Sequence, residues 1–399
     1  MKILVVSQRF YPENFRVNDI VKELLSRGHQ VTVLTGLPNY PEGYIYPNYK
    51  NGQNRNENFY GANVIRVKEI ARRKNIFFRF LNYYSFPFFG NMKIRSIDND
   101  FDVVLVNQLS PIMMVNPAIE YKKSTKTKIL MYEMDLWPES LLAGGIKKDS
   151  IMYRYYKKVS AKIYSKIDCI LVSSKGHIEY IKRLSSTPEI KYLPQYAEAI
   201  YTTVLSKKRK DVFTFVFAGN IGKAQNLDNL LDACLLASKA NGNAFQVYIV
   251  GDGSEKHQLE NRCKNMNLDK IVIFPGKKTT EEVIEFYNKA DALIVSLENS
   301  DYAKATVPGK VQSYMLAGKP IFSIASGETN DLIEEAKCGL TSPSDRIDLI
   351  SKGLNDFCGL DESILYQFGN NAKQYSSTNF DKKHFVDVIE EELQMLSNK

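Results

Sequence analysis

Short apolar runs alternate with amphipathic segments along the whole chain. In the first half, runs typical of buried strands occur at Lys2–Val6, Val31–Thr35, Asn63–Val67, Val103–Asn107, Ile129–Tyr132 and Cys169–Ser173. Between the first two runs, apolar residues at helical spacing predict a helix over Arg16–Ser26, which Gly28 ends. Because strands alternate with helices, we predict a parallel sheet with right-handed crossovers.

A second series of the same kind follows the charged run Lys207–Asp211, which is typical of a linker. Its strands are predicted at Phe213–Ala218, Gln246–Val250, Val272–Phe274, Ala292–Ser296 and Ile321–Ile324. One helix is predicted near Leu227–Ala237, and a last helix near Lys383–Leu396 could pack on either domain. Since 399 residues exceed one hydrophobic core, we predict an α/β protein with two Rossmann-like doubly wound parallel-sheet domains facing across a cleft.

The composition indicates in which cellular compartment the protein functions. The five cysteines are scattered and form no Cys-x-x-Cys pair, which argues against disulfides and against a zinc site. The first residues lack the long apolar run of a signal peptide, and no apolar stretch is long enough to span a bilayer. We therefore expect a cytoplasmic protein.

The net charge of +8 is concentrated in two segments that also carry many aromatic residues. The basic residues of these segments are Arg72, Arg73, Lys74, Arg79, Lys93 and Arg95 in the first, and Lys147, Lys148, Arg154, Lys157, Lys158, Lys162 and Lys166 in the second. Basic residues beside exposed aromatics suit an anionic membrane surface. The alternative is that the aromatics are core and the charges a solvated face. Nucleic acid could use the same chemistry, but we do not expect it as a partner.

Three loops at predicted strand or helix ends have the composition of phosphate or nucleotide sites. Gly219, Asn220, Gly222 and Lys223 lie between a strand and a helix, and Gly251 and Gly253 follow the next strand. In the segment Thr306–Pro320, a turn at Pro308 and Gly309 leads through Lys310 and Val311 into a short helix, where a diphosphate would find N–H groups and a cation. Each loop also reads as an ordinary turn or connection in an α/β protein.

The strand at Ile129–Tyr132 leads to a second candidate, Asp135, at its carboxyl end. We interpret Asp135 as catalytic or as the cap of the next helix, and Trp137 as a wall for a sugar. The Asp98–Asp100 motif resembles a metal–diphosphate pattern of another transferase fold, but it precedes a strand and is typical of a polar turn. The four histidines show no ligand spacing, so no metal is expected.

Six segments together resemble the family-4 retaining glycosyltransferases over nearly the whole chain. They are KILVVSQRFYPE, RGHQVTVLTGLPNYP, DLWPES, FVFAGNIGKAQNLDNLL, VYIVGDG and VPGKVQSYMLAGKPI. The subgroup that the chain resembles most is the bacterial O-antigen and capsule transferases of N-acetyl-L-fucosamine. The resemblance implies the GT-B fold, with an acceptor-binding domain over 1–206, a nucleotide-sugar-binding domain over 212–375, and a C-terminal helix over 376–399 that returns to the first domain.

The chain departs from the family pattern at the donor site. Where the family usually has two glutamates, this sequence has Ala305 and Ser313, and where it has Arg and Lys, this sequence has Asn220 and Gln225. The resemblance therefore implies that Lys223 and Lys310 take the diphosphate role and that Ser313 makes a weaker ribose contact. Glu298 and Asp301, just upstream, are alternatives for the missing acid.

These observations lead to one functional expectation. It is a retaining glycosyltransferase that moves a sugar from a UDP donor to a lipid-linked saccharide, without metal or cofactor, at the inner face of the cytoplasmic membrane. Asp135, Lys223 and Lys310 are expected to be catalytic. The expected donor-binding residues are Gly219, Asn220, Gly222, Gly251, Gly253, Pro308, Gly309, Val311 and Ser313. The alternatives are a UDP-amino-sugar 2-epimerase of the same fold and a non-catalytic sugar-nucleotide-binding partner of a polysaccharide assembly complex.

Overall fold

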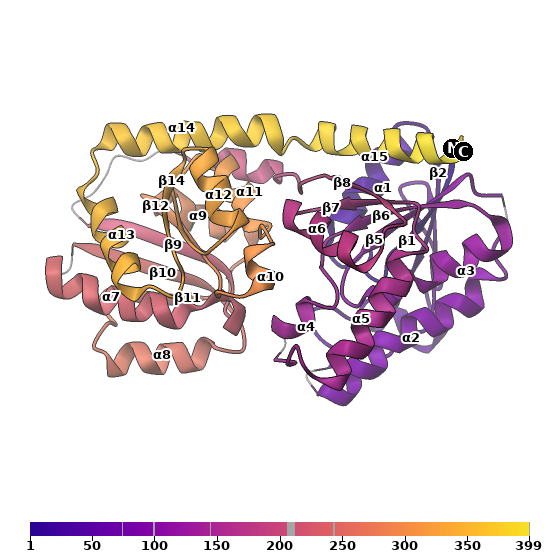
Figure 1. The fold of residues 1–399 in the computed structure, drawn as a ribbon, viewed down its shortest axis with the longest axis horizontal. Helices are drawn as coiled ribbons and strands as arrows, with labels where there is room; N and C mark the ends of the chain where they lie inside the picture. Colours follow the sequence, from indigo (N-terminus) through magenta and orange to yellow (C-terminus); the bar gives the residue numbers. More distant parts are fainter. Residues whose placement is uncertain (74, 99, 144, 206–211, 242–243, 399) are drawn as a thin grey trace. The chain divides into compact units, whose positions relative to one another are not determined.

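The chain folds into two compact units, each built around its own sheet (Figure 1). The computed structural model describes residues 1–73, 75–98, 100–143, 145–205, 212–241 and 244–398. The first unit combines Met1–Leu193 with Lys383–Lys399, and the second spans Pro194–Lys382. The run 207–211, expected to be a linker, lies outside the described residues.

The first unit contains an eight-stranded sheet in the order β3-β4-β2-β1-β5-β6-β7-β8. Its strands are β1 (Lys2–Val6), β2 (Gln30–Thr35), β3 (Asn56–Phe59), β4 (Ala62–Arg66), β5 (Val103–Gln108), β6 (Lys128–Glu133), β7 (Cys169–Val172) and β8 (Glu189–Tyr192). All neighbouring pairs are parallel except β3 with β4, which is antiparallel. Ile3 at the centre pairs with Val31 on one side and Val103 on the other, so β1 is buried between apolar neighbours.

Helices connect these strands and cover the sheet. They are α1 (Arg16–Ser26), α2 (Ile76–Ile94), α3 (Asn116–Thr125), α4 (Ser140–Ala143), α5 (Ile151–Tyr164), α6 (Lys175–Leu184) and α15 (Lys382–Ser397), with 3-10 turns η1 (Pro47–Gly52) and η2 (Ile112–Val115). Ion pairs fix α15 to the first unit: Arg27 binds Asp387 at 2.7 Å and Glu390 at 2.6 Å, and Lys191 binds Glu392 at 2.6 Å. The Ser397 hydroxyl lies 3.5 Å from the Sδ atom of Met1, so α15 ends beside the first residue of the chain (Figure 1).

The second unit contains a fully parallel six-stranded sheet in the order β11-β10-β9-β12-β13-β14. Its strands are β9 (Phe213–Asn220), β10 (Phe245–Asp252), β11 (Val272–Gly276), β12 (Ala292–Ser296), β13 (Ile321–Ile324) and β14 (Gly339–Ser342). Its helices are α7 (Leu227–Asn241), α8 (Lys256–Asn265), α9 (Thr280–Lys289), α10 (Asp301–Lys304), α11 (Lys310–Leu316), α12 (Glu328–Glu335), α13 (Ile347–Gly359) and α14 (Glu362–Asn379), with 3-10 turns η3 (Ala199–Thr203) and η4 (Lys223–Gln225).

Alternate residues of β9 show that this sheet is covered on both faces. Phe213, Phe215 and Phe217 belong to one buried cluster, which includes residues of α7 and α13. Val216 and Ala218 belong to another, which includes residues of α9 and α11. Strands with apolar partners on both faces are typical of doubly wound sheets. The predicted fold class of two such sheets is confirmed.

Three strands were missed by the predictions, namely β3, β8 and β14. Each lies at an edge of its sheet, and most of their residues are exposed or only half-buried. Edge strands cover less of the core, so their sequences lack the continuous apolar run that marks the central strands.

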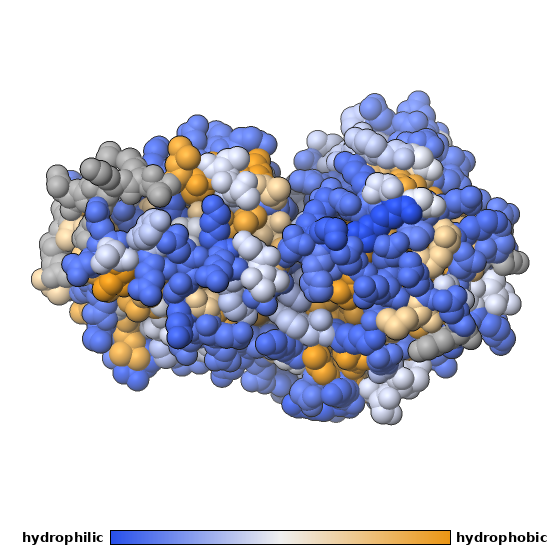
Figure 2. All heavy atoms as spheres, turned by 90° about the horizontal axis from the view of Figure 1, so that it is seen from above, coloured by the Kyte–Doolittle hydropathy of each residue, from blue (hydrophilic) through white to orange (hydrophobic). Residues whose placement is uncertain are grey.

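The surface drawn in Figure 2 is mainly hydrophilic in each of the two units. Figure 2 shows its hydrophobic residues in small, separate groups among polar ones. Single apolar residues are normal on a protein surface, so this face has no obvious interaction patch among the described residues. No helix of the described residues is long and apolar enough to cross a bilayer.

Candidate active site

Two glycine loops meet at the carboxyl edge of the second sheet. Gly251 pairs with Gly219, and Asp252 with Asn220, at the last positions of β10 and β9. A side chain cannot be added to Gly251, because its Cβ would lie 1.8 Å from the carbonyl oxygen of Gly219 and its φ is 150°. Gly253 is equally restricted, since its Cβ would lie 2.2 Å from the carbonyl oxygen of Ile221. These glycines therefore let two loops approach closely at the edge where α/β folds bind ligands.

The loop after β9 is closed by its own side chains. The Oε1 atom of Gln225 accepts hydrogen bonds from the N–H of Gly222 at 3.1 Å and from Nδ2 of Asn220 at 3.3 Å. Gln225 stands where the resembling family usually has a lysine. The N–H of Gly222, expected to bind phosphate, is thus already bonded within the loop, while the side chain of Lys223 is exposed.

Lys310 is the most unusual charged group at this edge. Its Nζ atom is buried, has no hydrogen-bond partner among the described residues, and lies 3.8 Å from the ring centroid of Phe217. Burial lowers the pKa of the Lys310 ammonium to about 7. A Cβ on Gly219 would lie only 2.8 Å from this nitrogen, so the lysine and the glycine loop are in contact. A buried ammonium beside an aromatic ring, with no acid, is suited to an incoming anion.

The segment Thr306–Pro320 forms the expected loop and short helix. Gly309 has a φ of −58°, which any residue adopts, so its backbone does not require glycine. The N–H of Val311 donates to the carbonyl oxygen of Pro308 at 2.9 Å and is therefore already used. Ser313 is buried at 6% exposure on α11. Of this segment, it is the side chain of Lys310 that reaches the glycine loops.

Three further side chains lie at this site, and the sequence alone does not indicate that they belong to it. The Tyr314 hydroxyl accepts from the N–H of Ala218 at 3.0 Å and donates to its carbonyl at 3.2 Å, which ties α11 to the end of β9. The Ser296 hydroxyl is buried at the end of β12 without a described partner. Phe217 reads as an ordinary core residue, because nothing in a strand sequence indicates a ring beneath an ammonium.

The acidic alternative Glu298 lies beside the same loop. Its N–H donates to the carbonyl of Ala224 at 2.8 Å, directly after β12. Asp301, by contrast, begins α10 and is exposed. The backbone position of Glu298 therefore makes it the better placed of the two acids for a ligand at the glycine loops.

In the first unit, Asp135 lies just beyond β6. Its carboxylate accepts a hydrogen bond from the Ser110 hydroxyl, and the same hydroxyl accepts from Nε1 of Trp137 at 2.6 Å. Asp135 is half-buried and does not cap α4, which begins at Ser140. The interpretation of Trp137 as a wall for a sugar is wrong, because its side chain is fully buried against Tyr83 and Tyr156.

The Asp98–Asp100 motif has a structural contact in its described part. The Asp100 carboxylate forms an ion pair with Lys2, and Asn99 lies outside the described residues. Among the described residues, no three side chains of His, Cys, Asp or Glu gather as metal ligands.

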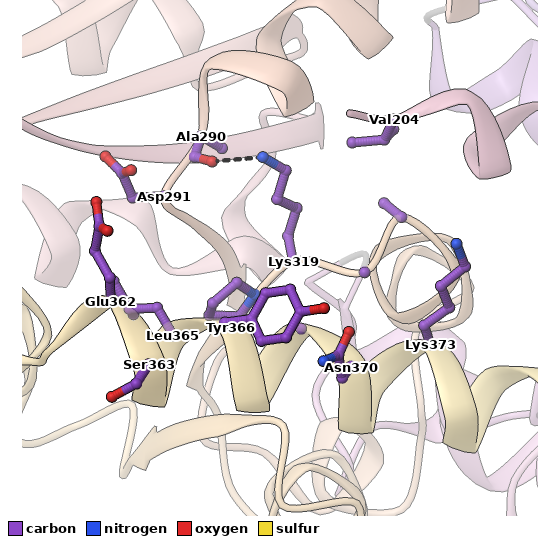
Figure 3. Close-up of a pocket in the computed structure, with 14 residues that line it drawn as sticks. Val204, Ala290, Asp291, Lys319, Glu362, Ser363, Leu365, Tyr366, Asn370 and Lys373 are labelled. Atoms are coloured by element: carbon purple, nitrogen blue, oxygen red, sulfur yellow. Dashed lines mark hydrogen bonds between the residues drawn. The ribbon is translucent and has the colours of Figure 1, made fainter. Parts of the chain in front are cut away.

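A cavity of about 590 Å³ lies at the opposite edge of the second sheet, beside the residues that lead into β12 and β13. Figure 3 shows Lys319 extending along it toward Ala290, whose carbonyl accepts from Nζ at 2.9 Å. Asp291 accepts from the N–H of Thr214 at 2.8 Å. Lys319 and Asp291 are therefore bonded within the protein, unlike the buried ammonium of Lys310.

Comparison with known proteins identifies the enzyme class and the fold. Residues 205–375 match the family model described as glycosyl transferases group 1. The probable glycosyltransferase WbjE of Pseudomonas aeruginosa is 27% identical over 299 residues, covering 70% of this chain and 71% of that protein. The putative colanic acid biosynthesis glycosyl transferase WcaI of Escherichia coli strain K12 is 22% identical over 345 residues, covering 80% and 82%.

Solved structures match nearly the whole chain at lower identity. Sucrose-phosphate synthase from Thermosynechococcus elongatus has a TM-score of 0.76 at 15% identity, covering 99% of this chain and 98% of that one. Anabaena HepE, solved in complex with UDP, has a TM-score of 0.72 at 13% identity, covering 99% and 100%. These likenesses concern the fold. The match over residues 205–375 and the glycosyltransferase relatives show that the chain is a glycosyltransferase, and its fold is that of the GT-B structures.

Proposed function

We propose that this glycosyltransferase moves a sugar from a UDP donor to a lipid-linked saccharide during O-antigen or capsule synthesis, with retention of anomeric configuration. N-acetyl-L-fucosamine is the first sugar to test. The observation that carries the proposal is the buried ammonium of Lys310, which has no described partner and contacts the glycine loop at Gly219. The relative named for colanic acid biosynthesis and the UDP complex of HepE support the polysaccharide and UDP parts.

The donor diphosphate would lie over the ends of β9 and β10. Gly251 and Gly253 allow the two loops to approach closely there, because a side chain at either position would meet the backbone of the neighbouring loop. As the bond between sugar and phosphate breaks, the leaving diphosphate gains negative charge. Lys310 would stabilise that charge from a buried position, where electrostatic interactions are strong, and the exposed Lys223 would add a weaker, solvated contact.

A retaining reaction of this kind needs no dedicated base. The departing phosphate can take the proton of the acceptor hydroxyl as the new bond forms on the same face of the sugar. Asp135, held by the Ser110 hydroxyl, would orient the acceptor or steady the positive charge that develops on the sugar. Glu298 would contact the donor ribose in place of the absent family glutamates, since its backbone bonds to the loop at Ala224.

The proposal extends to the membrane surface because a lipid-linked acceptor is anchored there. On α2 and α5, the exposed large apolar side chains are Phe77, Phe80, Phe88, Met92, Ile151, Met152 and Tyr155. A hydrogen bond of 3.1 Å between Tyr84 and Tyr156 joins the two helices. Exposed basic residues lie close to these side chains in the sequence, namely Arg73, Arg79, Lys93, Lys147, Lys148, Arg154, Lys157 and Lys158, whereas Lys74 lies outside the described residues. We name this set of apolar and basic residues the α2–α5 surface.

Product analysis tests the reaction. The full-length protein is incubated with a panel of UDP-sugars, with and without lipid-linked acceptors, and products are identified by mass spectrometry and anomeric NMR. We expect a glycosylated lipid whose new bond keeps the donor configuration. A changed UDP-sugar without acceptor would indicate the 2-epimerase instead. UDP-sugar binding with neither transfer nor hydrolysis would indicate the non-catalytic alternative, and inverted products would overturn the retaining mechanism.

A further inference from the structure

A cavity of about 680 Å³ opens in the first unit, at the carboxyl edge of its sheet. Leu37 follows β2, and Lys68, Glu69 and Ile70 follow β4, so two parallel strands lead into it. Asn51 and Gly52 line it from the end of η1, Arg55 from the residues just before β3, and Phe89 from α2. The volume is that of a small-molecule site, and this edge is where α/β sheets place ligands.

Arg55 brings an uncompensated charge to this cavity. Its Nη1 atom is buried and has no hydrogen-bond partner among the described residues. Burial alone lowers the pKa of its guanidinium, because no acid in the described structure offsets the loss of water. Lys68, on the same cavity, is exposed and adds a second positive charge.

Neighbouring arginines show how this unit normally compensates buried guanidinium groups. Arg66 pairs with Glu57 at 2.6 Å, donates to the carbonyl of Gly36 at 3.3 Å and stacks on the Tyr49 ring at 4.8 Å. Arg9 pairs with Glu69 at 3.1 Å. Among the three arginines compared here, Arg55 is therefore the one whose counter-charge has to come from outside the described structure.

Glu69 does not supply that counter-charge. Its Oε1 atom is held by Arg9 at 3.1 Å, by Gln8 at 2.9 Å and by Asn82 at 2.6 Å. Its Oε2 atom lies beside Gly36, where an added Cβ would be 1.8 Å from it, and has no hydrogen-bond partner among the described residues. Burial raises the pKa of this carboxyl group. Glu69 thus forms a fixed wall of the cavity, and the positive charge of Arg55 remains for a ligand.

We propose that this cavity binds an acidic sugar residue of the acceptor saccharide, with Arg55 and Lys68 holding its carboxylate or phosphate group. The proposal rests on the proposed transferase function, which makes the acceptor a saccharide. Arg55 presents a planar fork that matches both kinds of anion. Leu37, Ile70 and Phe89 provide the apolar wall on which a sugar ring can pack, and the amide of Asn51 can bond its hydroxyls.

Binding of simple probes to the full chain tests this site without requiring turnover. Methyl glucuronide, glucose 6-phosphate, methyl glucoside and inorganic phosphate are titrated at constant ionic strength and followed by ligand-observed NMR. We expect wild-type protein to bind the two acidic sugars about tenfold more tightly than methyl glucoside, as one charge-assisted contact implies. Glucose 6-phosphate should also bind more tightly than inorganic phosphate, because the ring adds contacts.

Variants distinguish binding in this cavity from non-specific attraction of anions to a basic protein. Arg55→Gln should abolish the preference for acidic sugars, and Arg55→Lys should reduce it, because the charge remains but the fork is lost. Arg183→Gln removes an exposed arginine on α6 and should leave the preference intact. UDP affinity, measured on every variant, should be unchanged and reports that the protein is folded.

Three results would overturn the proposal: equal binding of acidic and neutral sugars by the wild type, an unchanged preference in Arg55→Gln, or inorganic phosphate binding as tightly as glucose 6-phosphate. A wild-type protein that fails to bind UDP but keeps the Arg55-dependent preference would overturn the proposed donor chemistry and support this site. The two ideas can therefore fail separately.

Discussion

At the scale of single residues, the proposed donor chemistry depends on Lys310. A buried ammonium over the ring of Phe217, without an acid, is costly to the folded protein, because a charge has lost its water without gaining a partner. Such a cost is typical of groups that act on a ligand rather than hold the fold together. From the sequence, Lys310 could be predicted as a cation near a turn. Its burial could not, because the ring beneath it comes from a strand far away in the chain.

Replacing Lys310 by methionine should have opposite effects on activity and stability. We expect Lys310→Met to slow sugar transfer about a hundredfold, or roughly 3 kcal/mol, through lost stabilisation of the leaving group. The free energy of unfolding should rise by about 1 to 4 kcal/mol, because an apolar side chain replaces an unpaired buried charge. Initial rates measure the loss of sugar transfer, and urea unfolding measures the free energy of unfolding. Lys239→Met, on an exposed position of α7, is the matched control and should change neither.

The pKa of Lys310 also predicts pH dependence. Its folded-state pKa of about 7 lies below the usual 10.5, so the unfolded chain holds more protons between these values and stability should rise with pH across that window. A bound diphosphate raises the pKa, so the complex holds a proton that the free protein lacks. UDP affinity should therefore fall above pH 7, by up to about tenfold per pH unit.

Calorimetry in buffers of different ionisation enthalpy measures this proton uptake directly. The uptake should disappear in Lys310→Met and persist in Lys239→Met. Affinity that is independent of pH between 7 and 9 in the wild type would contradict a diphosphate contact at Lys310.

At the scale of elements, the central strands and the edge strand β11 were predictable, whereas the other three edge strands were not. Ala292–Ser296 and Ile321–Ile324 agree with β12 and β13 residue for residue, because both are continuous apolar runs buried on two faces. The strand β14 escaped prediction because its sequence, GLTS, is only half-buried at an edge. The loops that contain Gly219 and Gly251 could be predicted from the sequence, because glycines follow predicted strands there. That Gln225 closes one of them could not be foreseen, since a glutamine amide has no preferred partner in sequence.

The contact between β9 and β10 predicts a sharp steric effect. Gly251→Ala places a methyl group 1.8 Å from the carbonyl oxygen of Gly219 at a positive φ, so we expect about 3 kcal/mol of destabilisation and weaker UDP binding. Gly359→Ala, where a Cβ meets nothing within 4 Å, should stay within about 0.5 kcal/mol. Urea unfolding of the two variants makes the comparison. If both variants have the same free energy of unfolding, the two loops can move apart without loss of stability, which would contradict this prediction.

At the scale of the whole molecule, the distribution of charge becomes relevant. The net charge of +8 includes the exposed basic residues of the α2–α5 surface, where apolar side chains stand beside them. Among these aromatics, Phe86 belongs to the core, whereas Phe77 and Phe80 are exposed. A mixed basic and apolar surface would bind anionic lipid headgroups electrostatically and insert its rings at the interface.

Vesicle sedimentation tests this surface. The protein should bind vesicles rich in phosphatidylglycerol at low salt and partly dissociate at high salt, because screening weakens the charged contacts. Phe77→Ser combined with Phe80→Ser should reduce binding by at least about tenfold. Tyr366→Ser, an equally exposed aromatic on α14, serves as control. Failure of the wild type to sediment at low salt would rule out this surface as a membrane contact.

The return of α15 to the first unit has a consequence for synthesis. The second unit is one continuous stretch, Pro194–Lys382, whereas the first is assembled from two stretches on either side of it. Growing chains fold domain by domain as they leave the ribosome. Here the second unit can be completed before the first, since Arg27 and Lys191 must wait for the acids of α15 to be translated. The nascent first unit would thus stay incomplete, and open to chaperones, until the last helix has emerged.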